Sequence, residues 1–258
     1  MYLHHATTSP RTAGLGRRAA VRLPALAGIG YTAAWIISLL VGAPNPPLAA
    51  TGKQVVTAFA GHSGPALAEF ALNEGVAALA LAAVVISVAR AARRGGHARA
   101  GGAAAAFGIA VAGLSLTQLA LGAWLFGEVV PERRAATAGT LYDAITRLDG
   151  PKMFLLAATA LAIAQLASRP RILPAWLAPL GFVLAAALVA SGVGYLLLAP
   201  GLSSAVYVSG TLLLIFVSAT GISARNSQSL SRTMRGSSLL EYRQADGGHA
   251  RIPPWPGG

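Results

Sequence analysis

Six long apolar stretches alternate with short polar connections along the chain. A helix that crosses a bilayer needs about 20 mostly apolar residues, because it rises about 1.5 Å per residue through about 30 Å of hydrocarbon. Such uniform stretches are too long for barrel strands, and lipid cannot satisfy exposed backbone groups. The pattern predicts an all-α, polytopic membrane protein, a bundle of six transmembrane helices at 23–43, 66–89, 103–126, 153–168, 174–199 and 203–224.

The connections between the predicted spans contain further helix and turn signals. Thr51 and Gln54 fit a capping box, and apolar residues at helical spacing follow them, which predicts a short amphipathic helix in the first outer loop. A second capping pattern begins at Thr140, and a second amphipathic helix is predicted over 141–148. The Asp-Gly-Pro sequence at 149–151 predicts a turn that ends it before the fourth span. Because the fourth apolar stretch is short, it is expected either to recruit residues 148–152 or to let its charged ends reach the interface. Pro24 can sit in the first turn of the first span, so Pro179, near the inner end of the fifth span, is the only internal proline, which argues against a helix broken near the middle of the membrane.

Positive charge is concentrated in alternate connections. Of the 20 Lys and Arg residues, 15 lie before the first span, after the second, between the fourth and fifth, or after the sixth. Because cytoplasmic loops are enriched in Lys and Arg, both termini are predicted to be cytoplasmic. Residues 1–22 are expected to form a basic, flexible cytoplasmic tail, residues 23–224 the transmembrane domain, and residues 225–258 a disordered cytoplasmic tail. The cytoplasmic arginines are expected to contact anionic lipid headgroups.

The composition restricts the compartment and the chemistry. The net charge is +12, but it resides in the connections and not on one folded face, which argues against a nucleic-acid partner. The absence of cysteine excludes disulfides, thiolate metal sites and thiol redox chemistry. Residues 1–22 are polar and basic, so no cleavable signal peptide is expected. The bias toward Ala, Gly and Arg suggests a high-GC bacterial genome, and the plasma membrane is the expected location.

No catalytic signature accompanies the spans. All five histidines lie outside the predicted helices, which argues against haem ligation or a serine–histidine dyad within the bundle. The sequence has no His-Glu-x-x-His motif, no P-loop and no kinase-like set. We therefore expect no cofactor, no bound metal and no enzymatic activity.

The second span contains the strongest functional signal. Glu69, Asn73 and Glu74 interrupt its apolar sequence, with Glu69 near the outer interface and Glu74 about 7 Å deeper. An unpaired carboxylate in hydrocarbon costs several kcal/mol, so such groups usually face the bundle or a watery cavity. One hypothesis is a proton- or cation-binding carboxylate that opens to the outside. The favoured alternative is structural: Glu74 pairs with Arg147 or Lys152 at the top of the fourth span and joins two helices.

Other polar residues lie at a similar depth. Gln118 in the third span, together with Tyr142, Asp149 and His62 from the outer loops, would complete an outward-facing polar pocket. The alternative for each residue is a simple hydrogen bond between helices. The candidate polar or ion site therefore consists of Glu69, Asn73, Glu74, Gln118, Arg147, Asp149 and Lys152.

Three short motifs support a family resemblance. They are Arg-Leu-Asp-Gly-Pro-Lys-Met at 147–153, Leu-Pro-Ala-Trp-Leu-Ala-Pro-Leu-Gly at 173–181 and Ser-Gly-Val-Gly-Tyr at 191–195. With them, residues 23–224 resemble uncharacterised six-span integral membrane proteins of high-GC bacteria, in the domain-of-unknown-function category. The resemblance implies this architecture and transfers no catalytic or binding residue.

Three classes of function remain open. The leading one is a non-enzymatic membrane component that responds to an ion or small molecule, with Glu74 as its central residue. The alternative is a secondary transporter or exporter with an outward-facing polar pocket around Glu74. It would work as a homo-oligomer, because six short spans form only a small pathway. A membrane enzyme ranks third.

Overall fold

The structure is a computed structural model that describes residues 10–169 and 173–225. Over these residues the protein is built from helices and their connections, without strands. The elements are α1 (Pro10–Val41), α2 (Gly52–Phe59), α3 (Ser63–Phe70), the π-helical segment η1 (Ala71–Val76), α4 (Ala77–Arg94), α5 (Ala98–Trp124), the π-helical segment η2 (Leu125–Val129), α6 (Ala135–Ala167), α7 (Leu177–Leu196), α8 (Pro200–Ser203) and a last helix, Ala205–Arg225.

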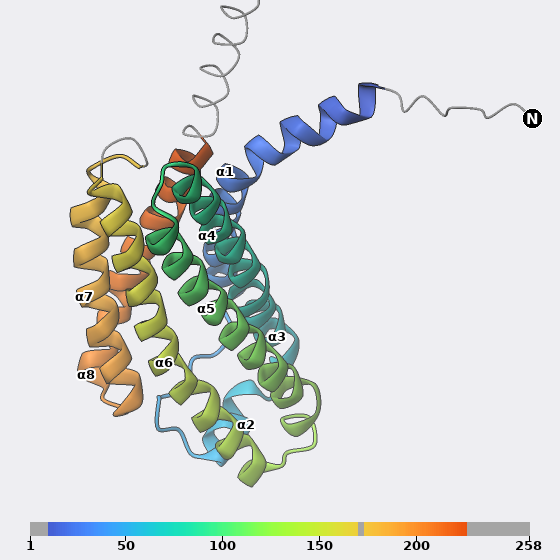
Figure 1. Ribbon diagram of the computed structural model, residues 1–258. Coiled ribbons are helices and arrows are strands. Elements are labelled where there is room, and N and C mark those ends of the chain that lie inside the picture. Colours follow the sequence, from blue (N-terminus) through green and yellow to red (C-terminus); the bar gives the residue numbers. More distant parts are fainter. Residues whose placement is uncertain (1–9, 170–172, 226–258) are drawn as a thin grey trace, which may run out of the picture.

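The prediction of six transmembrane helices is confirmed. The helices that are long and apolar enough to cross a membrane are Arg22–Val41, Ser63–Arg94, Ala98–Val129, Ala135–Ala167, Leu177–Leu196 and Ala205–Arg225. The start of α1 and the end of the last helix lie at the same end of the bundle, as an even number of spans requires (Figure 1). The N-terminal boundary differs from the prediction, because α1 already begins at Pro10. Residues 1–9 and the predicted C-terminal tail at 226–258 lie outside the described residues.

The spans form a closed ring in which each helix packs against its neighbours in the sequence. Helix α4 contacts α1 and α5, and α6 contacts α5 and α7. The last helix returns to α1, where the Thr32 and Ser218 hydroxyls lie 2.7 Å apart. At this contact Gly221 lies against the Pro24 carbonyl, and a Cβ there would overlap it. Small residues allow membrane helices to approach closely, so the backbones of α1 and the last helix lie in direct contact here.

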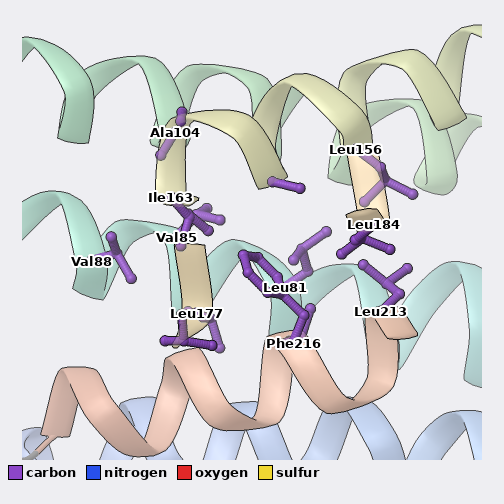
Figure 2. Close-up of a cluster of buried hydrophobic side chains, with 14 of the residues drawn as sticks. Leu81, Val85, Val88, Ala104, Leu156, Ile163, Leu177, Leu184, Leu213 and Phe216 are labelled. Atoms are coloured by element: carbon purple, nitrogen blue, oxygen red, sulfur yellow. The ribbon is translucent and has the colours of Figure 1, made fainter. Parts of the chain in front are cut away.

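Two separate hydrophobic clusters hold the helices together. The membrane cluster fills the bundle and includes Leu81 and Val85 of α4, Ile163 of α6, Leu184 of α7 and Phe216 of the last helix (Figure 2). The cap cluster lies at the opposite end from the start of α1, where α2 packs against the first half of α6 (Figure 1).

The cap cluster is built around aromatic side chains. The rings of Phe59 and Phe70 lie edge-on to Phe126, with centroid distances of 4.8 and 5.3 Å. Helix α2 begins with the predicted capping box, in which the Thr51 side chain accepts from the Gln54 N–H and the Gln54 side chain accepts from the Thr51 N–H. The first predicted amphipathic helix is thereby confirmed.

The second predicted amphipathic helix is not separate from the fourth span. Both belong to α6, so the predicted turn at 149–151 is wrong. Thr140 does not cap a helix; its hydroxyl donates to the Ala136 carbonyl within α6. Proline has a helix-compatible φ and removes only one hydrogen bond, whereas a turn within lipid would leave several backbone groups unpaired. Gly150 also packs tightly against Leu196 of α7, which favours a continuous helix.

Two prolines lie inside membrane helices, whereas Pro179 lies in the first turn of α7. Pro151 lies inside α6 and Pro24 inside α1. The expectation that Pro179 would be the only internal proline is wrong. It failed because the helix boundaries at both places were predicted too late in the sequence.

A candidate ion-pair site between the two hydrophobic clusters

Four buried or half-buried polar side chains meet where the cap cluster ends and the membrane cluster begins. We call them the Lys152 cluster: Glu74 on η1, Gln118 on α5, and Asp149 and Lys152 on α6. On α6, Ile145 belongs to the cap cluster and Met153 to the membrane cluster, with the two charged residues between them. Apolar side chains therefore bound the site on both sides.

The Lys152 ammonium group is the centre of the cluster. Its Nζ lies 2.8 Å from Glu74 Oε1, 2.8 Å from Gln118 Oε1, and 2.6 Å from Asp149 Oδ1. An ammonium has three N–H donors, and three oxygens from three different elements match them. The Lys152 side chain is 9% exposed, that of Glu74 15% and that of Asp149 22%. A buried charge is tolerated when it is paired and hydrogen-bonded in this way.

Gln118 fixes the geometry around the two charges on α6. Its Nε2 donates to the Ile145 carbonyl at 3.0 Å and to Asp149 Oδ1 at 3.1 Å, while its Oε1 accepts from Lys152. The amide is 1% exposed, so its hydrogen-bonding groups have protein partners in place of water. Every polar atom of this side chain is therefore used to hold α5 against α6.

The cluster contains one positive charge and two carboxylates. Among the ion pairs of the described residues, Lys152 is the cation that contacts Glu74 and Asp149. With both carboxylates ionised, the group carries one excess negative charge in an environment of low dielectric constant. One bound proton or one monovalent cation would neutralise it.

The backbone is irregular in both helices that supply charged residues to the cluster, at Glu74 in the second span and beside Lys152 in α6. Glu74 lies in the π-helical segment η1, and π-helical turns inside longer helices occur frequently at functional sites. Pro151, next to Lys152, has no N–H to donate to the carbonyl four residues earlier. The two elements joined by the Glu74–Lys152 ion pair thus both depart from regular helical hydrogen bonding beside it.

Helix α1 packs against η1, the segment of the second span that carries Glu74. Tyr31 is buried and lies close enough to Glu74 and Lys152 to interact with them electrostatically. The Ser38 hydroxyl donates to Asn73 Oδ1 at 2.7 Å. Tyr31 and Ser38 were not predicted as part of the site. The signal that could have identified them is their polar side chains within the apolar first span.

The predicted site residues do not all come together. Glu74, Gln118, Asp149 and Lys152 form the cluster described above. Asn73 is turned toward α1. Glu69 is half-buried on α3, one turn of helix before the cluster.

Arg147 is not the partner of Glu74. Its Nε lies 2.9 Å from Asp143 Oδ2 in an exposed pair within α6, and its Nη1 lies 3.5 Å from the Leu196 carbonyl. Because α6 is continuous, Arg147 is five residues from Lys152 and points to a different side of the helix. Of the two predicted partners of Glu74, Arg147 and Lys152, the structure pairs Lys152 with it.

Two further residues of the predicted pocket make local contacts in the cap. Tyr142 donates to the Pro46 carbonyl at 2.9 Å, and the His62 ring lies 3.1 Å from the Ala60 carbonyl.

No protein-family model, curated protein or solved structure matches this chain. The site itself is therefore the basis for any functional conclusion.

Proposed function

We propose that this integral membrane protein is a non-enzymatic component that responds to an ion or small molecule bound at the Lys152 cluster. The observation that carries the proposal is a buried ammonium shared by two carboxylates, Glu74 and Asp149, from different helices. A purely structural ion pair needs only one carboxylate, whereas the second leaves excess charge that a ligand would balance. Ionisable residues within a membrane are costly and usually mark functional sites.

The setting of this function is also part of the proposal. The distribution of Lys and Arg supports a plasma-membrane protein with both termini in the cytoplasm and arginines against anionic headgroups. The motifs at 147–153, 173–181 and 191–195 support a place among the uncharacterised six-span proteins of high-GC bacteria. The sequence also lacks histidine in the spans and supports neither an enzyme nor a nucleic-acid partner.

A secondary transporter is the second candidate. Transporters commonly bind their substrates where spanning helices are interrupted. The π-helical segment at Glu74 and the internal Pro151 are irregularities of this kind, and they adjoin the same ion pair. We expect such a transporter to work as a homo-oligomer.

The test is thermal unfolding of the purified protein with a panel of ions and small metabolites at fixed pH. Wild type and Glu74→Gln are compared with Glu128→Gln, which removes an exposed carboxylate at the end of η2. A ligand at about 100 times its dissociation constant stabilises the folded state by about 2.7 kcal/mol. We expect a ligand that raises the melting temperature of wild type and Glu128→Gln but not of Glu74→Gln. Equal ligand shifts in all three proteins, or the absence of any effect that depends on Glu74 both with the panel and on a change of pH, would contradict the proposal.

Transport is tested separately in proteoliposomes with the ligand that this panel identifies. Flux that is lost in Glu74→Gln and kept in Glu128→Gln supports a transporter. Binding without flux supports a responsive membrane component instead.

A further inference from the structure

We infer that Glu74 is the group in the Lys152 cluster that binds a proton, and that this proton weakens the link between the second span and α6. The inference rests on the proposed function and names the ligand of that same site. It follows from the unequal hydrogen bonding of the two carboxylates, from their places in the fold, and from the irregular backbone at Glu74.

The two carboxylates are not equally stabilised in the ionised form. Asp149 Oδ1 accepts from both the Lys152 ammonium and the Gln118 amide. Glu74 accepts through Oε1 from Lys152 alone, as far as the hydrogen bonds of the described residues show. Hydrogen bonds to the charged form favour that form, so a proton that enters the cluster goes to Glu74 in preference to Asp149.

The two ion pairs also differ in what they join. Asp149 and Lys152 are three residues apart on α6, so their pair persists however the helices move. Glu74 reaches the same ammonium from η1 in the second span, so its pair holds two helices together. A change at Glu74 therefore acts on the packing of the second span, whereas a change at Asp149 acts within α6 and on its contact with α5.

Protonation of Glu74 balances the charge of the cluster. The proton binds a carboxylate oxygen of Glu74, the Lys152 ammonium keeps its three protons, and one cation then faces one anion, Asp149. The contact between helices falls from an ion pair to a hydrogen bond between the ammonium and a neutral carboxyl oxygen, so the Coulomb attraction between two opposite charges is lost. The second span is then held to α6 chiefly by apolar packing.

The groups around Glu74 support this assignment. Tyr31 lies near Glu74 on α1, Gln118 of α5 is linked to it through the shared ammonium, and Lys152 and Asp149 lie on α6. On its own span, the other carboxylate is Glu69, which lies on α3. Within the described residues, the cation among these groups is Lys152, which Asp149 already binds.

The π-helical segment allows the second span to respond. Residues Ala71–Val76 have wider turns than the α-helices on either side, and Glu74 lies within them. Such segments are sites where long helices kink. Weakening the Glu74–Lys152 contact therefore frees a helix at a point where its direction can change.

The chain contains no cysteine, so two introduced cysteines can be labelled uniquely. Gly64 on α3 and Thr140 on α6 are exposed, and a Cβ at Gly64 meets no atom within 4 Å. Spin labels at Gly64→Cys and Thr140→Cys report the separation of the two helices in lipid bilayers. We expect the distance distribution to lengthen reversibly as the pH is lowered from about 7 to about 3, a range that extends to both sides of the reference pKa of a free glutamate.

Two variants in this labelled background decide the assignment. Glu74→Gln keeps the shape of a protonated glutamate, so we expect the longer distances at every pH. Asp149→Asn removes the excess negative charge and leaves Lys152 entirely to Glu74, so the shorter distances should persist to lower pH than in wild type. A pH response that survives in Glu74→Gln, or an identical distribution at every pH in wild type and Glu74→Gln, would overturn the inference.

The same proteins separate this inference from the proposed function. If a ligand other than the proton stabilises wild type but not Glu74→Gln at fixed pH, while the spin-label distances do not depend on pH, the site is functional and the proton is not its ligand. If neither ligand nor pH has an effect that depends on Glu74, both proposals fail.

Discussion

Substitution of Lys152 by methionine removes the cation that Glu74 and Asp149 share. Methionine keeps much of the side-chain length, so the main change is the loss of charge and of three hydrogen bonds. Removing one partner of a buried ion pair costs about 3–5 kcal/mol, because the other charge stays buried without compensation. Two carboxylates are left here, both at most 22% exposed, so we expect a loss in the upper part of that range.

Glu74→Gln is expected to be milder. The ammonium keeps Asp149, and the glutamine oxygen can still accept its hydrogen bond. The loss should be about 1–2 kcal/mol, since the ion pair becomes a hydrogen bond from the ammonium to a neutral amide oxygen. The double variant removes both members of the pair between helices, so its loss should be smaller than the sum of the single losses by about 1–3 kcal/mol.

Reversible unfolding in mixed micelles measures these free energies. Arg147→Met is the matched control: it also removes a cation from α6, but from an exposed pair with Asp143, and little change is expected. The reasoning is refuted if Lys152→Met and Glu74→Gln are additive within about 0.5 kcal/mol, or if Lys152→Met is no more damaging than Arg147→Met.

Two further predictions concern packing. Thr220 Oγ1 is buried and has no hydrogen-bond partner among the described residues, so Thr220→Val should be neutral or stabilise by about 1 kcal/mol in the same assay. Thr159→Val removes a hydroxyl that donates to the Leu155 carbonyl within α6 and should destabilise by about 1 kcal/mol, so equal effects of the two substitutions would contradict this explanation. A Cβ on Gly52 would overlap the Ala135 carbonyl, so Gly52→Ala should separate α2 from α6 and speed hydrogen exchange in α2. Gly64→Ala, which points into open space, should leave that exchange unchanged, and the same rates in both variants would count against close α2–α6 packing.

The apolar periodicity was sufficient to predict the spans but not all of their ends. Hydrocarbon thickness requires long apolar helices, and this requirement acts on each span independently of its neighbours. The continuity of α6 through Pro151 depends on packing against α7, which is a contact between residues far apart in the sequence. A local turn signal such as Asp-Gly-Pro carries no information about that contact.

The candidate site was predictable in its parts but not in its arrangement. Rare polar residues at one depth of the membrane indicated Glu74, Gln118 and Lys152, since each must find a partner within the bundle. Which partner each residue finds depends on the rotation of every helix. Arg147 was the alternative partner because the predicted turn would have reoriented it, whereas the continuous helix turns it toward Asp143.

Infrared difference spectroscopy of the protein in lipid, between about pH 7 and about pH 3, can show directly which carboxylate of the Lys152 cluster binds the proton. We expect the carbonyl band of protonated carboxyl groups that appears on acidification to contain a component in wild type that is missing in Glu74→Gln. The same band in both proteins would show that the proton binds elsewhere and would contradict the assignment of Glu74 as the responsive group.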